Sequence, residues 1–369
     1  MVNGARLPCH FVFVCFENRF LCDQKTIPDA SRNNTIQFAI YHLLFTSMST
    51  LIIVNHAAAK ARRAWPVVRD MLDAAGVAFD AYETTAIGDA TLRTRAALTK
   101  GVTTIGVVGG DGTLSEAAEG FFDLKKNAGE LPTSINPSAA LAILPAGTGD
   151  DFARGLTNGA RASLDYWTSI FISHCQQRDD KPAKLVDVLY GICHPARQFI
   201  CLNASTMGIG GETATRVAAQ GKLMRRLSGE ARFAAAAFVS IAHWRERRVH
   251  VSVDDETLID GPMNLAAVAN ALYAGGGMML SPEARSDDGK LDVVIASGLT
   301  RVEVLRELGR IHKGGHVANP KVKLAKGVKA CIETFAPRDA MPIEVDGNVR
   351  GVTPVEFHVL PQVLKIVTG

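Results

Sequence analysis

The sequence lacks the features that mark membrane-spanning proteins, secreted proteins and proteins with a structural zinc site. Its longest apolar stretch, Phe233 to Trp244, is about half of the ~20 residues that a membrane-spanning helix needs. The apolar segment Leu7 to Phe16 is followed by charged residues and by no small-residue cleavage site, so we expect no signal peptide. The seven scattered cysteines form no CxxC pair and no zinc-spaced cluster, which predicts reduced thiols in a cytosolic protein.

A strong charge of one sign and a high aromatic content are also missing. The formal net charge is +3 over 369 residues and aromatic residues make up 7%, so nothing favours nucleic-acid binding. Hydrophobic residues make up 47% and charged residues 21%, as in ordinary soluble globular proteins. At roughly 150 residues per domain, the length suggests two domains.

Hydrophobic residues spaced as in helices or strands appear only from Met48 onward. We expect residues 1–47 to be a disordered extension outside the fold, with Met48 as the natural start. Residues 48–184 alternate strands with helices, which predicts a parallel α/β domain. Its expected strands are 51–54, 77–82, 104–108 and 141–144, and its expected helices are 62–75, 89–100, 113–126 and a segment from 150 onward.

Residues 185–369 change character and contain short runs rich in β-forming residues. Turn residues such as Asp254-Asp255 and Asp346-Gly347 separate most of these runs, which predicts an antiparallel β-sandwich domain. The expected strands are 186–190, 198–204, 248–253, 265–270, 291–296, 329–335, 342–345 and 355–359. Two helical insertions are expected at 211–244 and 301–313, and the last strand is free to return to the first domain.

The strongest chemical signal is the string GGDGT at Gly109–Thr113, between a hydrophobic strand and a helix. Glycines let the backbone approach a phosphate, and the helix start presents free N–H groups. Thr113 and Glu116 have the spacing of a capping box. The Asp111 carboxylate would repel phosphate unless it holds a metal ion, so the string predicts a Mg²⁺-nucleotide site; the alternative is a tight turn with a capping Asp.

A second glycine-rich loop follows the next expected strand, with the sequence LPAGTGDDFAR at Leu144–Arg154. Asp151 and Arg154 are three residues apart and would share one helix face. Taken alone, this loop also fits a capped helix with a surface ion pair. In a parallel sheet both loops lie at the carboxyl edge of the strands, where ligands bind.

Together the two loops resemble the diacylglycerol kinase catalytic domain, in its bacterial lipid kinase branch. The resemblance runs from about Thr50 to Val367 and includes Thr84, Gly88–Ala90, Asn203–Ser205, Gly208–Gly210, Asn270, Gly275–Met278, Ser281–Ala284, Asp287–Asp292 and Asp346-Gly347. It implies an α/β plus β architecture: a phosphofructokinase-like nucleotide domain and an antiparallel β-sandwich, with the active site in the cleft between them.

The resemblance also implies roles for individual residues. Those implied to contact ATP are Asn55, Thr84, Gly109, Gly110, Asp111, Gly112, Thr113, Leu114, Ser115, Glu116, Gly147, Thr148, Asp151 and Arg154. Asp111 would organise the catalytic Mg²⁺, with support from Asp187. Arg285, Asp288 and Lys290 would hold a structural Mg²⁺, although the same loop fits a simple hairpin turn.

The sequence departs from the family pattern in three places. The first loop, Asn55–Lys60, lacks the usual glycine, and Asp150 replaces the usual Asn. At the position of the family's proton-accepting Glu the chain has Asn348, and an amide cannot accept a proton at neutral pH. The enzyme would then be slow, use Asp346 or Asp187 as its base, or be inactive.

These observations predict an ATP- and Mg²⁺-dependent kinase acting on a diacylglycerol-like or sphingoid lipid. The alternatives are an NAD kinase, which also uses GGDGT, and a catalytically weak nucleotide- or lipid-binding regulator. A cytosolic protein with a lipid substrate must reach the membrane surface, and basic residues flank the apolar run Phe233–Ile241. These basic residues are Lys222, Arg225, Arg226, Arg232, Arg245, Arg247 and Arg248; a solvated surface helix and a homodimer stay open.

Overall fold

The computed structural model describes residues 50–124, 130–177, 183–221, 224, 227 and 229–368. These residues belong to one compact unit, Met48–Gly369. The expected extension at 1–47 lies outside the described residues. Among the described helices none combines the length and the apolar character needed to cross a bilayer. The described cysteines carry free thiols, as expected: Cys175, Cys193, Cys201 and Cys331.

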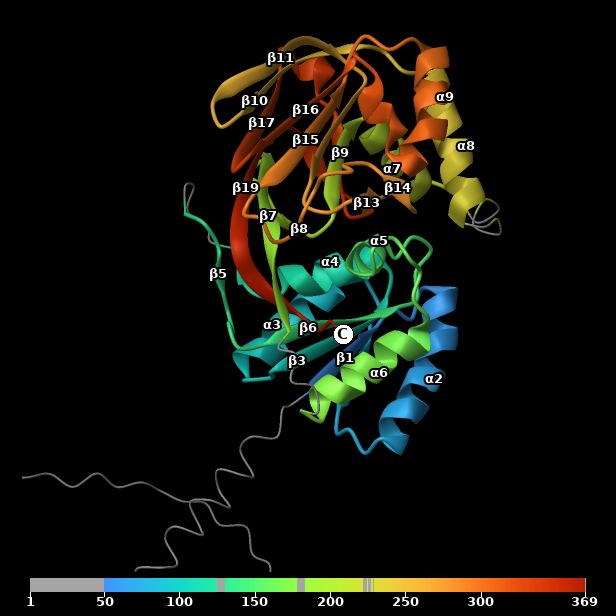
Figure 1. Cartoon of the computed structure of the whole chain (residues 1–369), viewed down its shortest axis with the longest axis vertical. Helices are drawn as coiled ribbons and strands as arrows, with labels where there is room; N and C mark the ends of the chain where they lie inside the picture. Colours follow the sequence, from blue (N-terminus) through green and yellow to red (C-terminus); the bar gives the residue numbers. More distant parts are fainter. Residues whose placement is uncertain are drawn as a thin grey trace, which may run out of the picture. The chain divides into compact units, whose positions relative to one another are not determined.

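The first half of this unit is a parallel sheet covered by helices. Its strands, in the spatial order β6-β3-β1-β2, are β1 (Thr50–Val54), β2 (Asp80–Glu83), β3 (Thr104–Gly109) and β6 (Ala140–Pro145). The helices are α2 (Ala59–Ala74), α3 (Asp89–Thr99), α4 (Asp111–Glu119), α5 (Asp151–Leu156) and α6 (Leu164–Cys175), and the short strands β4 (Phe122–Asp123) and β5 (Thr133–Ser134) pair separately. Helices α2 and α6 pack together, as do α3 and α4 (Figure 1).

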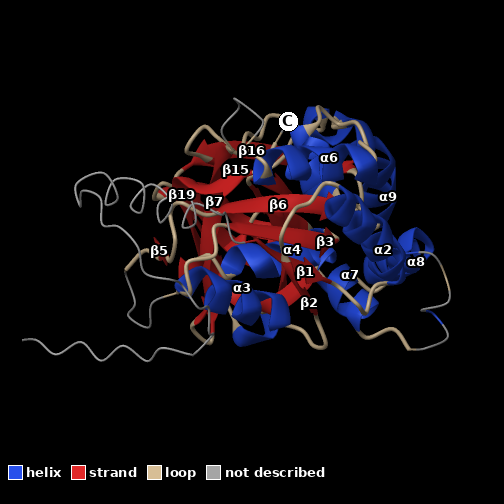
Figure 2. Cartoon of the chain, turned by 90° about the horizontal axis from the view of Figure 1, so that it is seen from below, coloured by secondary structure: helices blue, strands red, loops and turns tan. Residues whose placement is uncertain are grey.

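The second half is mainly antiparallel. Its strands are β7 (Lys184–His194), β8 (Arg197–Cys201), β9 (Ala204–Gly208), β10 (Arg247–Val253), β11 (Glu256–Met263), β12 (Leu265–Ala269), β13 (Tyr273–Ala274), β14 (Met278–Met279), β15 (Leu291–Ala296), β16 (Val322–Gly327), β17 (Lys329–Thr334), β18 (Pro342–Val345) and β19 (Asn348–Ile366). Its helices are α7 (Ile209–Ala218), α8 (Gly229–Ala242) and α9 (Arg301–Arg310), with 3-10 turns at Ile311–Lys313, Gly315–Ala318 and Pro337–Asp339. Figure 2 shows the strands at the centre with helices around them.

The long strand β19 joins the two halves. It pairs antiparallel with β17, β18 and β7, and its end pairs parallel with β6 through Lys365 and Ile366. In Figure 1 it curves from the antiparallel half down to the parallel half. In the described part of the chain the strands therefore form one continuous mixed sheet of 15 strands, apart from two small two-stranded sheets.

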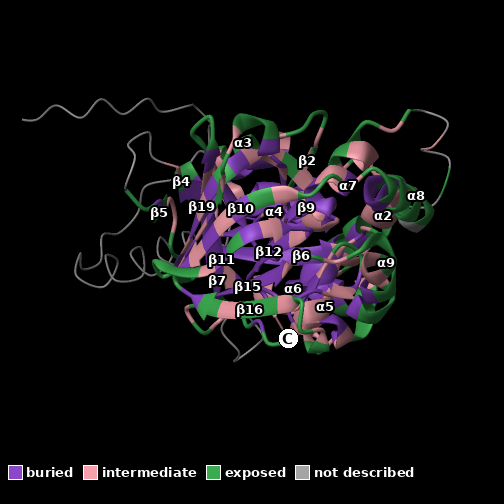
Figure 3. Cartoon of the chain, turned by 90° about the horizontal axis from the view of Figure 1, so that it is seen from above, coloured by how far each residue is buried: buried purple, intermediate pink, exposed green. Residues whose placement is uncertain are grey.

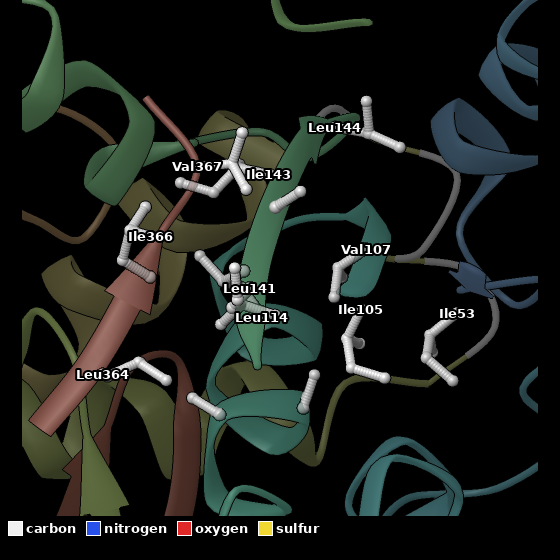
Figure 4. Close-up of a cluster of buried hydrophobic side chains, with 14 of the residues drawn as sticks. Ile53, Ile105, Val107, Leu114, Leu141, Ile143, Leu144, Leu364, Ile366 and Val367 are labelled. Atoms are coloured by element: carbon white, nitrogen blue, oxygen red, sulfur yellow. The ribbon is translucent and has the colours of Figure 1, made fainter. Parts of the chain in front are cut away.

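Each half has its own hydrophobic core. The first core contains side chains from β1, β3, β6 and α4, together with Leu364 and Ile366 from the end of β19 (Figure 4). The second lies among the antiparallel strands and includes Val249, Ile343 and Phe357. Figure 3 shows the buried residues concentrated in the strands and the exposed residues on the loops and the outer faces of helices.

Several expected elements differ from the observed ones. The helix expected at 113–126 is α4, which begins earlier and ends at Glu119, where Gly120 and the strand β4 follow. The expected helix 211–244 is two helices, α7 and α8, and the expected strand 355–359 is the central part of β19. Strands β11 and β16 were not expected. The mixed α/β class is confirmed, whereas the phosphofructokinase-like and β-sandwich descriptions and the boundary at 184/185 stay predictions.

The capping-box prediction for α4 is wrong. The helix begins at Asp111 with Gly110 as its N-cap, and no side chain caps it. The Thr113 hydroxyl instead accepts a hydrogen bond from Asn55 Nδ2 at 2.8 Å, and Glu116 Oε2 accepts one from the Gly88 N–H. The helix start is therefore tied to the loops after β1 and β2.

Candidate active site

Four loops meet at the carboxyl edge of the parallel strands. Asn55 follows β1, Thr84 follows β2, Gly110 follows β3 and Ala146 follows β6. Asn55 N–H donates to the Val108 carbonyl, and Ala146 N–H donates to the Gly109 carbonyl. Adjacent parallel strands place their following loops side by side, so the two glycine-rich loops lie at one edge, as the sequence predicts.

The two glycine-rich loops touch backbone to backbone at Gly110 and Gly147. A Cβ at Gly147 would lie 2.5 Å from Gly110 Cα and 2.6 Å from Asp150 Oδ1, and a Cβ at Gly110 would lie 3.0 Å from Gly147 Cα. Gly147 therefore requires glycine because of this close approach, and a side chain at Gly110 would make a tight contact. Lys60 Nζ donates to the Gly147 carbonyl at 2.9 Å and steadies this contact from α2.

The Asp111 carboxylate is held at the start of α5. Its Oδ2 accepts from Asp151 N–H at 3.0 Å, and its Oδ1 accepts from Phe152 N–H at 3.0 Å and from Asn203 Nδ2 at 3.3 Å. Donors from both halves of the unit thus fix this side chain. A carboxylate oriented in this way is positioned for chemistry beside the glycine loops, rather than for capping its own helix.

Two further carboxyl groups crowd the same loop. Burial, and then the Asp111 charge, raises the pKa of Asp150 to about 6, and the same causes raise the pKa of Asp151 to about 6. A Cβ at Gly149 would lie 3.0 Å from Asp151 Oδ2 and 3.2 Å from Asp111 Oδ2, so the two carboxylates are neighbours. This arrangement concentrates negative charge that a bound cation would offset.

The residues around Asp111 fit a magnesium ion. Asp151 Oδ1 is buried and has no hydrogen-bond partner. Mg²⁺ binds nucleotides through one or two protein carboxylates plus phosphate oxygens, so it needs no larger protein cluster. Among the described residues no group of three His, Cys, Asp or Glu side chains could hold a metal by itself.

Asp151 and Arg154 contact the second half of the unit. Asp151 is buried and its Oδ2 accepts from the Gly276 N–H at 2.7 Å. The Arg154 guanidinium lies 5.5 Å from the Tyr273 ring centroid, and a Cβ at Gly277 would lie 2.2 Å from Arg154 Nη1. The two residues expected to contact ATP therefore also dock α5 against the glycine turn between β13 and β14.

The other residues expected to contact ATP differ in accessibility. Thr84 is partly exposed and its N–H donates to the Val54 carbonyl. Leu114 and Ser115 are buried on α4, with Leu114 in the first core (Figure 4). Thr148 is exposed, and the start of α8 lies close to it, since a Cβ at Gly229 would be 3.0 Å from Thr148 Oγ1. Any ligand contact made by Leu114 or Ser115 would come from the backbone.

The turn at Asp346–Asn348 abuts the GGDGT loop. Asn348 Nδ2 lies 3.4 Å from the Gly112 carbonyl oxygen, to which it donates. Asp346 is buried, and its carboxylate accepts from the N–H groups of Leu202, Asn203 and Ala204. The structure thus places Asn348 at the site and commits Asp346 to holding the turn between β8 and β9.

Asp187 lies elsewhere. It is fully buried, its Oδ2 accepts from Gly289 N–H and its Oδ1 accepts from Gln362 N–H, both at 2.7 Å. Among the described residues no hydrogen bond joins its carboxylate to the residues that hold Asp111. Its carboxylate therefore joins the loop after β14 to β19, and support of the catalytic Mg²⁺ by this side chain stays a prediction without a contact behind it.

The residues expected to hold a structural Mg²⁺ already face a lysine. Asp288 Oδ1 accepts from Lys290 N–H, and Asp288 Oδ2 lies 3.6 Å from Lys326 Nζ. The same ammonium donates to the Glu283 carbonyl at 2.8 Å and lies 3.4 Å from Asp292 Oδ1. As arranged, these residues do not fit a metal ion, because Lys326 supplies the positive charge.

This arrangement predicts the effect of Lys326→Met. The buried Asp292 would lose its charged partner, which costs about 1–3 kcal/mol and lowers the melting temperature by several degrees. Without nucleotide, adding Mg²⁺ or EDTA should leave the melting temperature of the wild type unchanged, while Mg²⁺ should partly restore that of the variant. A Mg²⁺-dependent rise in the wild type that Asp288→Asn removes would contradict the lysine assignment.

Sequence reasoning missed two residues at the site. Asn203 donates to Asp111 from the second half, and the Lys60 ammonium donates to the Gly147 carbonyl. The string Asn203–Ser205 was noted, but nothing in it signals which carboxylate the amide would meet. Lys60 had a signal: it is a positive residue at the end of the loop that lacks glycine, in the first turn of α2.

Comparisons with known proteins match both halves. Residues 49–182 match the diacylglycerol kinase catalytic domain, and residues 206–368 match the YegS C-terminal NAD kinase beta sandwich-like domain. The chain belongs to the diacylglycerol kinase catalytic-domain family. It falls in the bacterial lipid kinase branch, since the second model is the YegS C-terminal domain.

Named relatives of this lipid kinase family member share modest identity with it. A diacylglycerol kinase from Mycobacterium tuberculosis is 27% identical over 278 residues, which are 73% of this chain and 78% of that protein. A diacylglycerol kinase from Staphylococcus saprophyticus is 26% identical over 321 residues, 86% of this chain and 94% of that protein. A crystal structure of a Bacillus anthracis diacylglycerol kinase shares the fold at TM-score 0.58 and 18% identity, covering 88% and 97% of the two chains.

Proposed function

We propose that this kinase transfers the γ-phosphoryl group of ATP to a hydroxyl of a diacylglycerol-like or sphingoid lipid. The observation that carries the proposal is the contact of the two glycine-rich loops at Gly110 and Gly147, with the oriented Asp111 carboxylate beside it. The cavity at the base of these loops is only 10 Å³, about one water, so the phosphates would bind on the outer side of the loops.

The residues of the chain would contribute mainly by positioning. Backbone N–H groups of the glycine loops orient the phosphates, and Asn203 and α5 hold the Asp111 carboxylate toward them. Bound at Asp111, Mg²⁺ would neutralise charge on the phosphates. The turn at Asp346–Asn348 brings the second half to the same loop, so an acceptor lipid held there would meet the phosphate.

Two other functions are distinguishable from this one. An NAD kinase function is suggested by the name of the family model that matches residues 206–368. The model that matches residues 49–182 is instead that of the diacylglycerol kinase catalytic domain. A catalytically weak nucleotide-binding regulator is suggested by Asn348, which stands where the family has its proton-accepting Glu. Incubation with γ-labelled ATP and either a lipid panel or NAD, followed by thin-layer separation, tests all three. Label in a lipid supports the proposal; label in NAD alone, or ATP binding without transfer, overturns it.

An exposed apolar stripe on α8 supports action at a membrane surface. The exposed residues along the helix are Ala231, Ala234, Ala235, Phe238, Val239 and Ala242. Phe238 is 63% exposed, and on the neighbouring α9 Val302 is 68% exposed and Leu305 is 44% exposed. The helices α8 and α9 pack side by side (Figure 1). Two helices that present apolar residues outward form a surface that fits the apolar part of a bilayer.

The basic residues expected around α8 are largely engaged within the fold. Arg247 pairs with Glu212, Arg245 pairs with Asp339, and Arg232 donates to the Gln220 side chain. Arg248 is exposed beside Phe335, and Arg301 and Arg306 are exposed on α9. Lys222, Arg225 and Arg226 lie outside the described residues. Apolar contact is therefore expected to outweigh attraction to anionic headgroups.

A substitution test follows for this surface. Phe238→Asp combined with Val302→Asp should reduce sedimentation with phosphatidylglycerol-containing vesicles by more than about tenfold, because each side chain buried in lipid contributes about 1.5–3 kcal/mol. The melting temperature should stay the same since both side chains are exposed. Leu131→Asp, at an exposed apolar position in the first half, is the control. Vesicle binding that survives the double substitution would place the membrane contact elsewhere.

A further inference from the structure

One carboxyl group beside the active-site turn has no part in the function so far. Glu344 is the penultimate residue of β18 and lies two residues before Asp346. Its Oε1 accepts from the Gly347 N–H at 2.5 Å, and its Oε2 accepts from the Thr206 hydroxyl at 2.6 Å. The side chain is partly exposed. It therefore lies between strand β9 and the turn whose Asn348 reaches the GGDGT loop.

The two carboxylates that the sequence offers as alternative bases accept more backbone N–H bonds than Glu344, which accepts one, from Gly347. Asp346 accepts three N–H bonds and is buried, and Asp187 accepts two and is fully buried. Protonating either one would break bonds that hold the second half together. Neither is placed to take a proton from a substrate, which removes both bases that the sequence offered in place of Asn348.

The surroundings of Glu344 suit proton exchange near neutral pH. Burial, and to a smaller extent the Asp346 charge, raises the pKa of Glu344 to about 7, against the lowering effect of the hydrogen bonds from Thr206 and Gly347. On the elements that pack against β18, Arg350 of β19 is paired with Glu119, and Glu212 of α7 is paired with Arg247. A base whose pKa lies close to the working pH is the most effective.

We propose that Glu344 is the proton acceptor that replaces the family's Glu at Asn348. The inference rests on the proposed lipid kinase function. The lipid hydroxyl gives its proton to a Glu344 oxygen as its own oxygen bonds to the γ-phosphorus. The bond from that phosphorus to the β,γ-bridging oxygen breaks, and ADP leaves with the bonding pair. Thr206, which holds one carboxylate oxygen, is a positioning residue for this step.

The test compares rates of phosphoryl transfer in single turnovers at saturating ATP·Mg²⁺, with a lipid acceptor in mixed micelles. In the wild type the rate should rise with pH to a plateau, with an apparent pKa near 7. Glu344→Gln keeps the shape of the side chain but cannot take the proton, so the plateau should fall by about 10²-fold or more and the pH limb should disappear. Glu333→Gln, a control on β17, should leave the rate and the limb unchanged.

Rescue separates a catalytic from a structural role. Adding Asn348→Glu to Glu344→Gln returns a carboxylate to the family's position, so the rate should recover at least tenfold, with a pH limb at lower pH. A wild-type rate and pH limb in Glu344→Gln would overturn the assignment, and so would a loss that Asn348→Glu does not rescue in a variant with wild-type melting temperature. Absence of lipid phosphorylation by the wild type at every pH would instead defeat the proposed function itself.

Discussion

Asp111→Asn is expected to lower the rate of phosphoryl transfer by about 10²–10³-fold. The substitution removes the charge that would hold the metal ion beside the phosphates, and such an interaction is worth several kcal/mol in the transition state. It also has a structural effect. The carboxylate accepts N–H bonds from both Asp151 and Phe152, and an amide offers one acceptor oxygen only. The measurement is single-turnover transfer at saturating nucleotide.

The same geometry gives Asp111→Asn a second signature. One α5 N–H loses its acceptor, so the free energy of unfolding should fall by about 1–3 kcal/mol and the melting temperature by a few degrees. Asp80→Asn, at an exposed position on β2, is the matched control and should change neither quantity. A folded Asp111→Asn variant with the wild-type rate would remove this carboxylate from the mechanism.

Gly147→Ala is expected to abolish nucleotide binding at concentrations that saturate the wild type. The new methyl carbon would lie 2.5 Å from Gly110 Cα. The backbone fixes the positions of both atoms, so no side-chain rotation can relieve the clash. The loops must separate, which moves the N–H groups of the phosphate site and costs about 1–3 kcal/mol of stability. Calorimetric titration with ATP·Mg²⁺ measures the first effect and thermal unfolding the second.

The chain supplies a control for this substitution on the adjacent helix. No atom lies within 4 Å of a Cβ built at Gly155 in α5, so Gly155→Ala should be accommodated. Alanine favours the helix by up to about 1 kcal/mol, and the melting temperature should rise slightly. Wild-type ATP affinity in Gly147→Ala would show that the contact of the two loops is not needed for binding.

The parallel half could be predicted from the sequence because its signals are local. Strands β1, β3 and β6 are largely apolar runs, and their bounds differ from the expected ones by one residue or so. Strands β3 and β6 end at glycine and proline, and β1 is followed by Asn55. Strand β11 was missed because Glu256–Met263 contains Asp260, Gly261 and Pro262, which disfavour strands. Its pairing with β10 overrides that propensity, and no local pattern reports such a partner.

The site divides along the same line. The two glycine loops and Asp111 are local motifs, and the sequence located them. The contacts of Asp151 with Gly276 and of Asp111 with Asn203 join residues 125 and 92 positions apart, and spacing along the chain carries no information on such pairs. The sequence does not single out Glu344 for a related reason. Its surroundings, and not its residue type, distinguish it from the other glutamates of the chain.

Strand β19 has a mechanical consequence. Its 19 residues begin at the turn that touches Gly112 and end in ladder bonds with β6, so one continuous strand, with register shifts at Val352/Val355 and Leu360/Leu364, is anchored in both halves. Moving the two halves apart would require breaking the pairing of β19 with β6 or its antiparallel pairing with β7. We expect entry and exit of ligands to depend on smaller parts of the fold outside this strand, such as α7, α8 and the glycine loops.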